Sequence, residues 1–290
     1  MKCKLSTQSK LKSVPRNGRT AEQLRNHFIV ESAIAQKLLS APREERSAIY
    51  LSMYDELFEK VPDHPRLNIR NNKKLSQRST NNKLKLVNHL LNDTTTFAEF
   101  APGDCRFAFR VAQTAKRIYG IDISEQYHQQ EIFPHNFQLI IYDGYTLSEI
   151  PDNSVDIVFS DQLIEHIHPE DVEHHFSIIK EMLTKNGSYV MRTPHKSSGP
   201  HDISVYFSDT PLGFHLKEWD YAQIKELSEK IGFNVMKTYW FAKGFKCRLP
   251  NYYFLILERV FAFLPSIISR KISKYFIPSV CCVFQVSKSE

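Results

Sequence analysis

The stretch from Thr94 to Ser124 constrains the fold of this chain most strongly. β-Branched and aromatic residues run up to Phe100 and predict a buried strand, and Pro102-Gly103 predicts a sharp turn. Apolar residues at helical spacing follow, and then a second apolar run that ends at Asp122. This order is typical of the first half of a nucleotide-binding βαβ unit, and Asp122 lies near the spacing at which a carboxylate binds ribose hydroxyls. We therefore expect an adenosine-containing ligand.

The alternation of strands and helices continues to the end of the chain. Further strands are expected at 137–142, 154–160, 188–192, 233–241 and 279–286, with helices at 169–183 and 218–230. Alternating units of this kind predict an α/β fold with a doubly wound, mostly parallel sheet covered by helices on both faces. Ligands of such sheets bind at the carboxyl ends of the strands.

Three regions are expected along the chain. Residues 1–20 hold six basic residues and no acid, which predicts a mobile basic arm. Residues 21–92 form an N-terminal helical extension, with helices at 21–40, 43–61 and 80–91. Residues 93–290 form the α/β domain, which carries a helical insertion at 246–276 between its last two strands.

The charges are distributed unevenly. Residues 1–92 carry 18 Lys/Arg against 8 Asp/Glu, residues 93–242 carry 12 against 22, and residues 243–290 carry 8 against 2. The basic flanks fit a phosphorylated substrate, an anionic membrane or a nucleic acid, and they equally fit solvated helix faces. Composition alone does not decide between these alternatives.

The cysteines and the N-terminus predict a cytoplasmic protein. The five cysteines are odd in number and lack metal-ligand spacing, so we interpret them as reduced thiols. The basic N-terminus has no apolar segment of the kind found in a secretory signal.

The segment 250–274 interrupts the α/β pattern. It is apolar from Asn251 to Leu264 except for a narrow polar stripe that includes Glu258 and Arg259. A transmembrane span needs about 20 apolar residues without central charges, so we reject a span. Three alternatives stay open: a lid over the substrate site, an interfacial helix that makes a peripheral membrane contact, or a helix packed on the sheet edge.

Several motifs in order resemble those of class I, Rossmann-like methyltransferases that use S-adenosylmethionine. The matching stretches are Glu99-Phe-Ala-Pro-Gly-Asp-Cys105, Tyr119-Gly-Ile-Asp122, Tyr142-Asp-Gly144 and Ser160-Asp-Gln-Leu-Ile-Glu-His166. The Lys185-Asn-Gly187 turn and Gly232-Phe233 also fit. Each motif alone is weak, but their order and spacing together are specific, and they cover residues 94–242.

The resemblance implies a role for each matching residue. The loop from Glu99 through Ala101 and Gly103 would pass under the methionine part of S-adenosylmethionine. Asp122, with Ile123 beside it, would hold the ribose hydroxyls. Asp143 would contact the adenine amino group, and Gly144 would leave room for the ring. Asp161 and Gln162 would line the cofactor end nearest the substrate.

The loop departs from the family pattern at two positions. The family usually has glycine where this chain has Ala101, and often where it has Cys105. A methyl group at Ala101 would lie close to the cofactor and could weaken its binding. A non-catalytic protein with the methyltransferase fold is therefore one alternative.

The histidines supply the candidate bases. His166 follows the fourth strand, where the family places residues that face the substrate, and an imidazole is suitably poised near neutral pH. His201 and His215 lie in the long segment after the fifth strand and are further candidates. Glu165, His166 and His168 resemble metal ligands, but a fixed site needs three convergent groups, so we expect no metal.

The expected function is methyl transfer from S-adenosylmethionine to a small-molecule or lipid-linked acceptor, with oxygen favoured because a histidine base is available. A nicotinamide-dependent oxidoreductase is a rival, but Gly103 is the only glycine of a loop that would need several. A nucleic-acid methyltransferase is another rival. We expect no nucleic-acid partner, because no motif for holding an extruded base is present.

Overall fold

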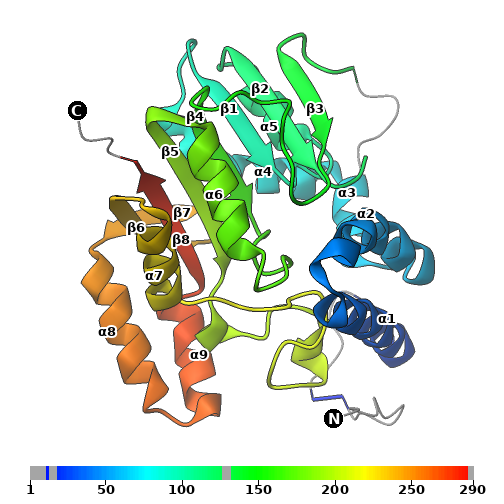
Figure 1. Cartoon of the computed structure of the whole chain (residues 1–290). Helices are drawn as coiled ribbons and strands as arrows, with labels where there is room; N and C mark the ends of the chain where they lie inside the picture. The colour runs from blue at the N-terminus through cyan, green and yellow to red at the C-terminus, as the bar shows by residue number, and fades with distance from the viewer. Residues whose placement is uncertain (1–10, 13–17, 126–131, 287–290) are drawn as a thin grey trace.

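The computed structural model describes residues 11–12, 18–125 and 132–286, which form one eight-stranded sheet with helices on both faces (Figure 1). The strand order is β3-β2-β1-β4-β5-β8-β6-β7. The first five of these strands pair in parallel, whereas β8 runs antiparallel between β5 and β6 and β7 pairs antiparallel with β6 at the edge. The strands are β1 (Thr96–Phe100), β2 (Arg117–Asp122), β3 (Phe137–Ile141), β4 (Val155–Asp161), β5 (Leu183–Pro194), β6 (Val235–Ala242), β7 (Phe245–Leu249) and β8 (Ser279–Gln285). The predicted doubly wound α/β fold is confirmed.

The helices of the α/β domain come between these strands in the sequence and cover the faces of the sheet. They are α5 (Arg106–Val111), α6 (Val172–Met182), α7 (Tyr221–Ile231), α8 (Asn251–Ala262) and α9 (Ser266–Phe276), with short 3-10 turns η2 (Lys196–Ser198) and η3 (Ile203–Tyr206). Figure 1 shows α6 and α7 in front of the sheet and α5 behind it. The sequence pattern does not predict β7, and the expected turn at Lys185–Gly187 is an irregularity within β5, where the pairing jumps from Leu183 to Ser188.

Both faces of the sheet are apolar, as the buried strand patterns predict. In β1, Phe97 packs on one face with Phe107 and Phe159, whereas Ala98 and Phe100 point to the cluster on the other face. Full burial of one such aromatic side chain contributes about 1.5–3 kcal/mol to stability. This central strand is therefore fixed from both sides, and so is the loop that follows it.

The N-terminal extension consists of α1 (Ala21–Ser40), α2 (Arg43–Lys60), α3 (Pro65–Asn71), α4 (Lys73–Val87) and the 3-10 turn η1 (Asn88–Leu90). Thr20 and Gln23 form a capping box that starts α1. Helix α2 docks on the domain through Arg46, 3.1 Å from Asp171, and through the Tyr50 hydroxyl, which accepts from the His168 amide at 2.7 Å. The extension is thus packed against the α/β domain. The predicted mobile arm, 1–20, lies mostly outside the described residues.

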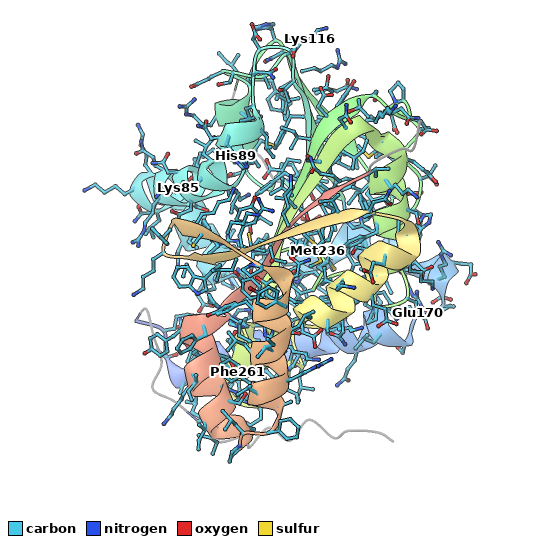
Figure 2. The ribbon with its side chains drawn as sticks, turned by 90° about the vertical axis from the view of Figure 1, so that its left-hand side faces the viewer. Lys85, His89, Lys116, Glu170, Met236 and Phe261 are labelled. Carbon is cyan, nitrogen blue, oxygen red and sulfur yellow. The ribbon has the colours of Figure 1, made fainter. Side chains whose placement is uncertain are left out.

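The 246–276 segment packs on the flank of the sheet. The ring of Phe254 stacks on Tyr221 of α7 with centroids 4.1 Å apart, and the Glu258 carboxylate accepts from the Tyr221 amide at 2.6 Å. Figures 1 and 2 show α8 and α9 side by side, beyond the end of β8. Within the described residues no helix has the length and apolar character that a membrane crossing requires.

Cys247, Cys281 and Cys282 are free thiols, and Cys105 is buried at the start of α5. Cys3 lies outside the described residues. Burial raises the pKa of Cys281 to about 12, so this thiol stays protonated and acts as a small apolar group.

Candidate active site

A cavity of about 500 Å³ lies at the carboxyl ends of β1, β2 and β4. Its floor comes from the loops after these strands, and its roof comes from α2, α3 and α4 of the N-terminal extension. The roof residues are Tyr50, Met53, Tyr54, Phe58, Arg66, Leu67, Ile69, Ser76, Ser79, Thr80 and Lys83. No residue of 246–276 lines this cavity, so of the three alternatives for this segment the lid is not supported. The N-terminal extension takes that place.

The loop after β1 has an unusual backbone. Ala101, Gly103 and Cys105 have φ values of 54°, 57° and 58°, which lie in the left-handed region. A residue other than glycine pays roughly 1–2 kcal/mol there. The loop therefore has a backbone conformation that favours glycine at three positions, although two of them are occupied by Ala101 and Cys105. A Cβ added to Gly103 would meet nothing within 4 Å, so this turn opens into the cavity.

Asp122 ends β2 beside that loop. Its carboxylate accepts from the Gly103 amide at 3.1 Å and from the Ile123 amide at 2.8 Å, and it is only 6% exposed. Burial raises the pKa of Asp122 to about 6, although the backbone hydrogen bonds oppose that rise. The carboxylate is thus oriented at the wall of the cavity, where the resemblance requires a ribose-binding acid.

The next wall is formed by Tyr142, Gly144 and the ring of Tyr50 from α2. Gly144 has a φ of 94°, and a Cβ there would approach the Tyr50 ring to 3.3 Å. Asp143, expected to contact adenine, does not line the cavity. Its carboxylate instead accepts from the Tyr145 and Thr146 amides at 2.7 and 2.6 Å, which stabilises the following turn.

Two buried polar atoms at this end have no hydrogen-bond partner among the described residues: the Tyr142 hydroxyl and His175 Nε2. Such atoms are costly unless a ligand or water satisfies them. His175 is buried, and burial lowers its pKa to about 3. Its ring lies edge-on to Phe100 with centroids 4.9 Å apart. The residues present fit a nucleoside ligand with polar substituents.

Two ion pairs contribute side chains to the wall of the cavity. Lys83 of α4 lies 2.9 Å from Glu99, and Arg192 of β5 forms a two-bond pair with Asp161 at 2.6 and 2.7 Å. Burial raises the pKa of Glu99 to about 7, and the attraction of Glu99 and Asp161 outweighs burial to raise the pKa of Lys83. Lys83 therefore keeps its charge. Glu99 itself lies behind Lys83 and does not line the cavity.

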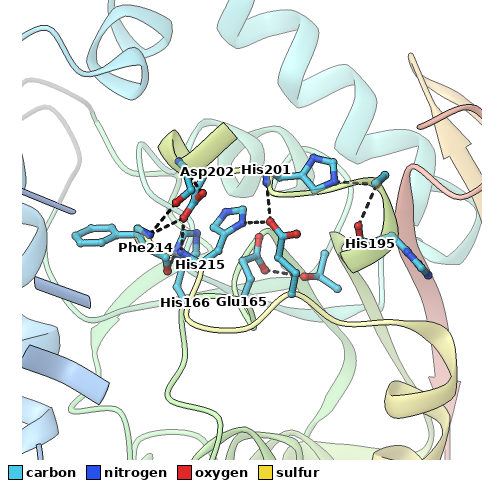
Figure 3. A network of polar contacts seen from close by, with 12 residues as sticks. Glu165, His166, His195, His201, Asp202, Phe214 and His215 are labelled. Carbon is cyan, nitrogen blue, oxygen red and sulfur yellow. Dashed lines mark hydrogen bonds and ion pairs between the residues drawn. The ribbon is translucent and has the colours of Figure 1, made fainter. Parts of the chain in front are cut away.

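His166 and His215 form the far end of the cavity, together with Arg66 and Gln162. His166 Nδ1 donates to the Phe214 carbonyl at 2.9 Å, and His215 Nδ1 donates to Glu218 at 2.8 Å (Figure 3). Burial holds the pKa of His166 well below its ordinary value. Burial also acts to lower the pKa of His215, but the hydrogen bond to Glu218 outweighs it and raises that pKa.

His201 does not line this cavity. It lines a second cavity of about 300 Å³, which shares Tyr54, Arg66, His166 and His215 with the first. Its Nε2 lies 2.8 Å from the Ser198 hydroxyl, and its amide donates to Glu218 at 2.7 Å. His201 thus contacts the carboxylate that orients His215.

Sequence reasoning missed Lys83, Arg66, Arg192 and Tyr50. The surplus of Lys/Arg in residues 1–92, which includes a basic run without acids from His64 to Asn92, indicated cations near this region, but it did not show which of them face inward. Lys73, Lys74, Arg78 and Lys85 of the same run are exposed.

Comparisons with known proteins agree with this geometry. Residues 98–191 match the model of the family described as "Methyltransferase domain". A probable S-adenosylmethionine-dependent methyltransferase from Mycolicibacterium smegmatis is 33% identical over 136 residues, which cover 44% of this chain and 48% of that protein. The match thus spans about half the length of that relative.

Two solved structures share the fold. A SAM-dependent methyltransferase from Archaeoglobus fulgidus has a TM-score of 0.51 at 18% identity, covering 72% of this chain and 94% of that one. The 1,6-didemethyltoxoflavin-N1-methyltransferase of Burkholderia thailandensis, with bound 1,6-didemethyltoxoflavin and S-adenosylhomocysteine, has a TM-score of 0.50 at 12% identity, covering 86% and 92%.

The sheet order, with five parallel strands, defines a Rossmann-like α/β fold. Within that fold, residues 98–191 match a methyltransferase domain, and the chain is similar to class I methyltransferases that depend on S-adenosylmethionine.

Proposed function

We propose that this protein transfers a methyl group from S-adenosylmethionine to an oxygen of a small-molecule acceptor. The proposal rests on the observation that Gly103, Asp122, His166 and His215 all line the same cavity. One end suits the donor and the other end suits a polar acceptor. The volume of about 500 Å³ is in the range of small-molecule sites.

The residues at the donor end would bind and orient S-adenosylmethionine. Asp122 would accept from the ribose hydroxyls, Tyr142 and Gly144 would contact the adenine, and Lys83 would face the methionine carboxylate. When bound, the cofactor supplies a methyl group on a sulfonium, so the S–C bond breaks as the new bond to the acceptor forms. The protein's contribution is alignment and exclusion of water, to which the roof of α2–α4 is suited.

The histidine end would activate the acceptor. His166 and His215 both line the cavity, and the Arg66 side chain is exposed there without a carboxylate partner among the described residues. Arg66 would bind an anionic or strongly polar group of the acceptor. The His201 imidazole would have no direct role, because it contacts Ser198 and only the backbone amide of His201 reaches Glu218.

The test is donor binding followed by turnover. Calorimetry with S-adenosylmethionine is expected to show one site per chain, and Asp122→Ala is expected to abolish binding without unfolding the protein. Transfer of label from the donor to a cell extract should fall about 10²- to 10⁴-fold in His215→Asn. Absence of donor binding would contradict the proposal, and donor binding without any transfer would favour a non-catalytic binding protein.

We also propose a peripheral contact with anionic membranes through α8 and α9. Tyr252, Ile256, Val260 and Phe263 recur along one side of α8, and all four are exposed, Phe263 to 89%. Figure 2 shows that α8 and α9 end together at the extremity of the molecule. The exposed Ile267 and Tyr275 continue the apolar face on α9, and exposed Arg259, Lys271 and Lys274 flank it. An apolar face bordered by cations is typical of interfacial helices.

Sedimentation with vesicles tests this contact. The protein should bind vesicles that contain phosphatidylserine and not vesicles of phosphatidylcholine alone. Phe263→Ser combined with Ile267→Ser should weaken binding about tenfold or more, whereas Ile69→Ser, an exposed apolar side chain of α3, should not. Equal binding of both variants would contradict the proposal.

A further inference from the structure

Glu165, His166 and His215 are buried together at the acceptor end of the cavity. One donor atom of each lies within 4.8 Å of the other two. Glu165 and His166 follow β4, and His215 lies in the long segment after β5. Two imidazoles and one carboxylate are the ligand set of several catalytic zinc sites and of open ferrous sites.

The hydrogen bonds around this cluster fix where the ring protons lie. The Phe214 carbonyl can only accept, so the proton of His166 is on Nδ1 and Nε2 offers a lone pair. Glu218 holds the proton of His215 on Nδ1 in the same way. Arg66 donates to His166 Nε2 at 3.3 Å, which agrees with this assignment. Histidines that bind metals usually donate their other ring N–H to a carbonyl or carboxylate in this manner.

The carboxylate is arranged to match. Glu165 Oε2 accepts from the Thr193 hydroxyl at 2.8 Å, whereas Oε1 is buried with no hydrogen-bond partner among the described residues. Leaving such an atom unsatisfied costs about 1–3 kcal/mol. Figure 3 shows Glu165, His166 and His215 gathered inside one polar network. Each of the three therefore has a partner on its outer side, and the inward-facing Nε2 of His166 receives only the long Arg66 contact.

A second cluster provides a contrast. His27 Nε2 and His64 Nε2 lie 2.7 and 3.6 Å from Glu31 Oε1. Their Nδ1 atoms face donors: Arg19 NH1 is 2.8 Å from His27, and the Arg66 amide is 3.2 Å from His64. Both rings therefore turn N–H groups, and not lone pairs, toward Glu31. This cluster is satisfied by hydrogen bonds and leaves nothing for a cation.

We propose that Glu165, His166 and His215 bind one divalent transition-metal ion, with an open coordination position that faces the cavity. Tetrahedral bonds of about 2.1 Å place ligand atoms about 3.4 Å apart, so the side chains would close in slightly on binding. Arg66 would release its long contact with His166 and move into the cavity, to which it is already exposed.

This inference rests on the proposed function. The ion would act at the acceptor end of the cavity, where it would help to activate the acceptor. A bound ion would supply Lewis-acid chemistry at its open position, lowering the pKa of an acceptor hydroxyl so that its proton passes to solvent. Methyl transfer to that oxygen would break the S–C bond of the donor and release a neutral thioether. The acceptor class is an alcohol or phenol with a second polar group for Arg66.

Zinc titration of untagged protein stripped with a chelator tests the site. Calorimetry should show one equivalent with a Kd of about 1 μM or tighter. Glu165→Gln and His215→Gln should weaken zinc binding about 100-fold, and Thr193→Val, which removes only a supporting hydroxyl, about tenfold. Cobalt substitution should give the visible absorption bands of a four- or five-coordinate site in the wild type and lose them in Glu165→Gln.

His27→Gln is the matched control and should leave zinc affinity unchanged. Arg66→Ala should bind zinc as tightly as the wild type or more tightly, because a neighbouring positive charge is removed. Absence of zinc binding below about 100 μM, or equal loss in the His27 and Glu165 variants, would overturn the metal site. Donor titration of the same samples separates the two proposals: donor binding without zinc binding rejects only the metal.

Discussion

The ammonium of Lys83 lies 2.9 Å from the carboxylate of Glu99, so helix α4 of the extension is joined to the strand that carries the donor loop. The Lys83 side chain is 17% exposed and Glu99 1%. The ammonium also lies 5.3 Å from the centre of the Phe107 ring. A cation of the roof, Lys83, is thus paired with a buried carboxylate of β1, the strand that leads into the donor loop.

Replacing Lys83 with Met should therefore do two things. It should lower the free energy of unfolding by roughly 1–3 kcal/mol, because Glu99 is left buried without its partner. It should also weaken donor binding, because the cation that faces the methionine end is lost. Denaturant unfolding and calorimetry measure these effects. Lys83→Met with Glu99→Gln should recover most of the stability but not the affinity, and recovery of both would show that Lys83 has no role in donor binding.

Donor affinity should depend on the ionisation of Asp122. Burial raises the pKa of Asp122 to about 6, and ribose hydroxyls bind its charged form. Affinity for S-adenosylmethionine should therefore fall about tenfold per pH unit below pH 6 and level off above pH 7. Because the folded pKa lies above the ordinary 3.8, this group alone stabilises the donor-free protein at low pH, and that contribution is lost as pH rises through about 6. Asp122→Asn should bind weakly with a flat pH profile, and a sloping profile in the variant would assign the titration elsewhere.

Ala101→Gly should stabilise the protein. Ala101 has a φ of 54°, and relief of roughly 1–2 kcal/mol of backbone strain exceeds the entropy of about 0.5–1 kcal/mol that glycine adds to the unfolded chain. A net gain of about 0.5–1 kcal/mol is expected in thermal unfolding, with donor affinity equal or higher. Ala98→Gly, in the extended backbone of β1, is the control and should lose stability. A loss of stability in both variants would mean that the contacts of the Ala101 methyl group stabilise the protein by more than its backbone strain destabilises it.

Glu258→Ala tests the role of α8. The Glu258 carboxylate accepts from the first amides of α7, Tyr221 and Ala222, and lies 2.8 Å from His195 Nε2. Its removal should lower the free energy of unfolding by about 1–3 kcal/mol and leave donor affinity unchanged under native conditions. Arg259→Ala, at the next and exposed position, should change stability by less than about 0.5 kcal/mol. Equal effects in the two variants would show that α8 is not held through Glu258.

The α/β domain could be predicted from sequence because the patterns that indicate its strands, turns and helices are each contained in a short stretch of chain. Strand patterns, the turn at Gly103 and the acid at Asp122 all lie within short windows, and the sheet order follows from the family fold. The insertion 246–276 was harder to place. Glu258 reads as part of a solvent-facing stripe, but it is turned inward and caps another helix, which no periodicity reveals.

The acceptor end was predicted only in part for the same reason. His166 and His215 could be named as candidates, but Arg66 meets His166 across 100 positions of chain, and Glu165 meets His215 across 50. Such partners depend on how the extension docks on the domain. The buried state of His175 was also missed, because helix α6 presents that face to Phe100 and the cavity.

The roof over the cavity is one continuous stretch that precedes the matched domain at 98–191. The wall that would face an acceptor and the loop that would face the donor thus belong largely to separate stretches of chain. Exchange of α2–α4 between relatives, with Tyr50 and Lys83 kept, would alter the roof and leave the loop of Gly103 and Asp122 unchanged.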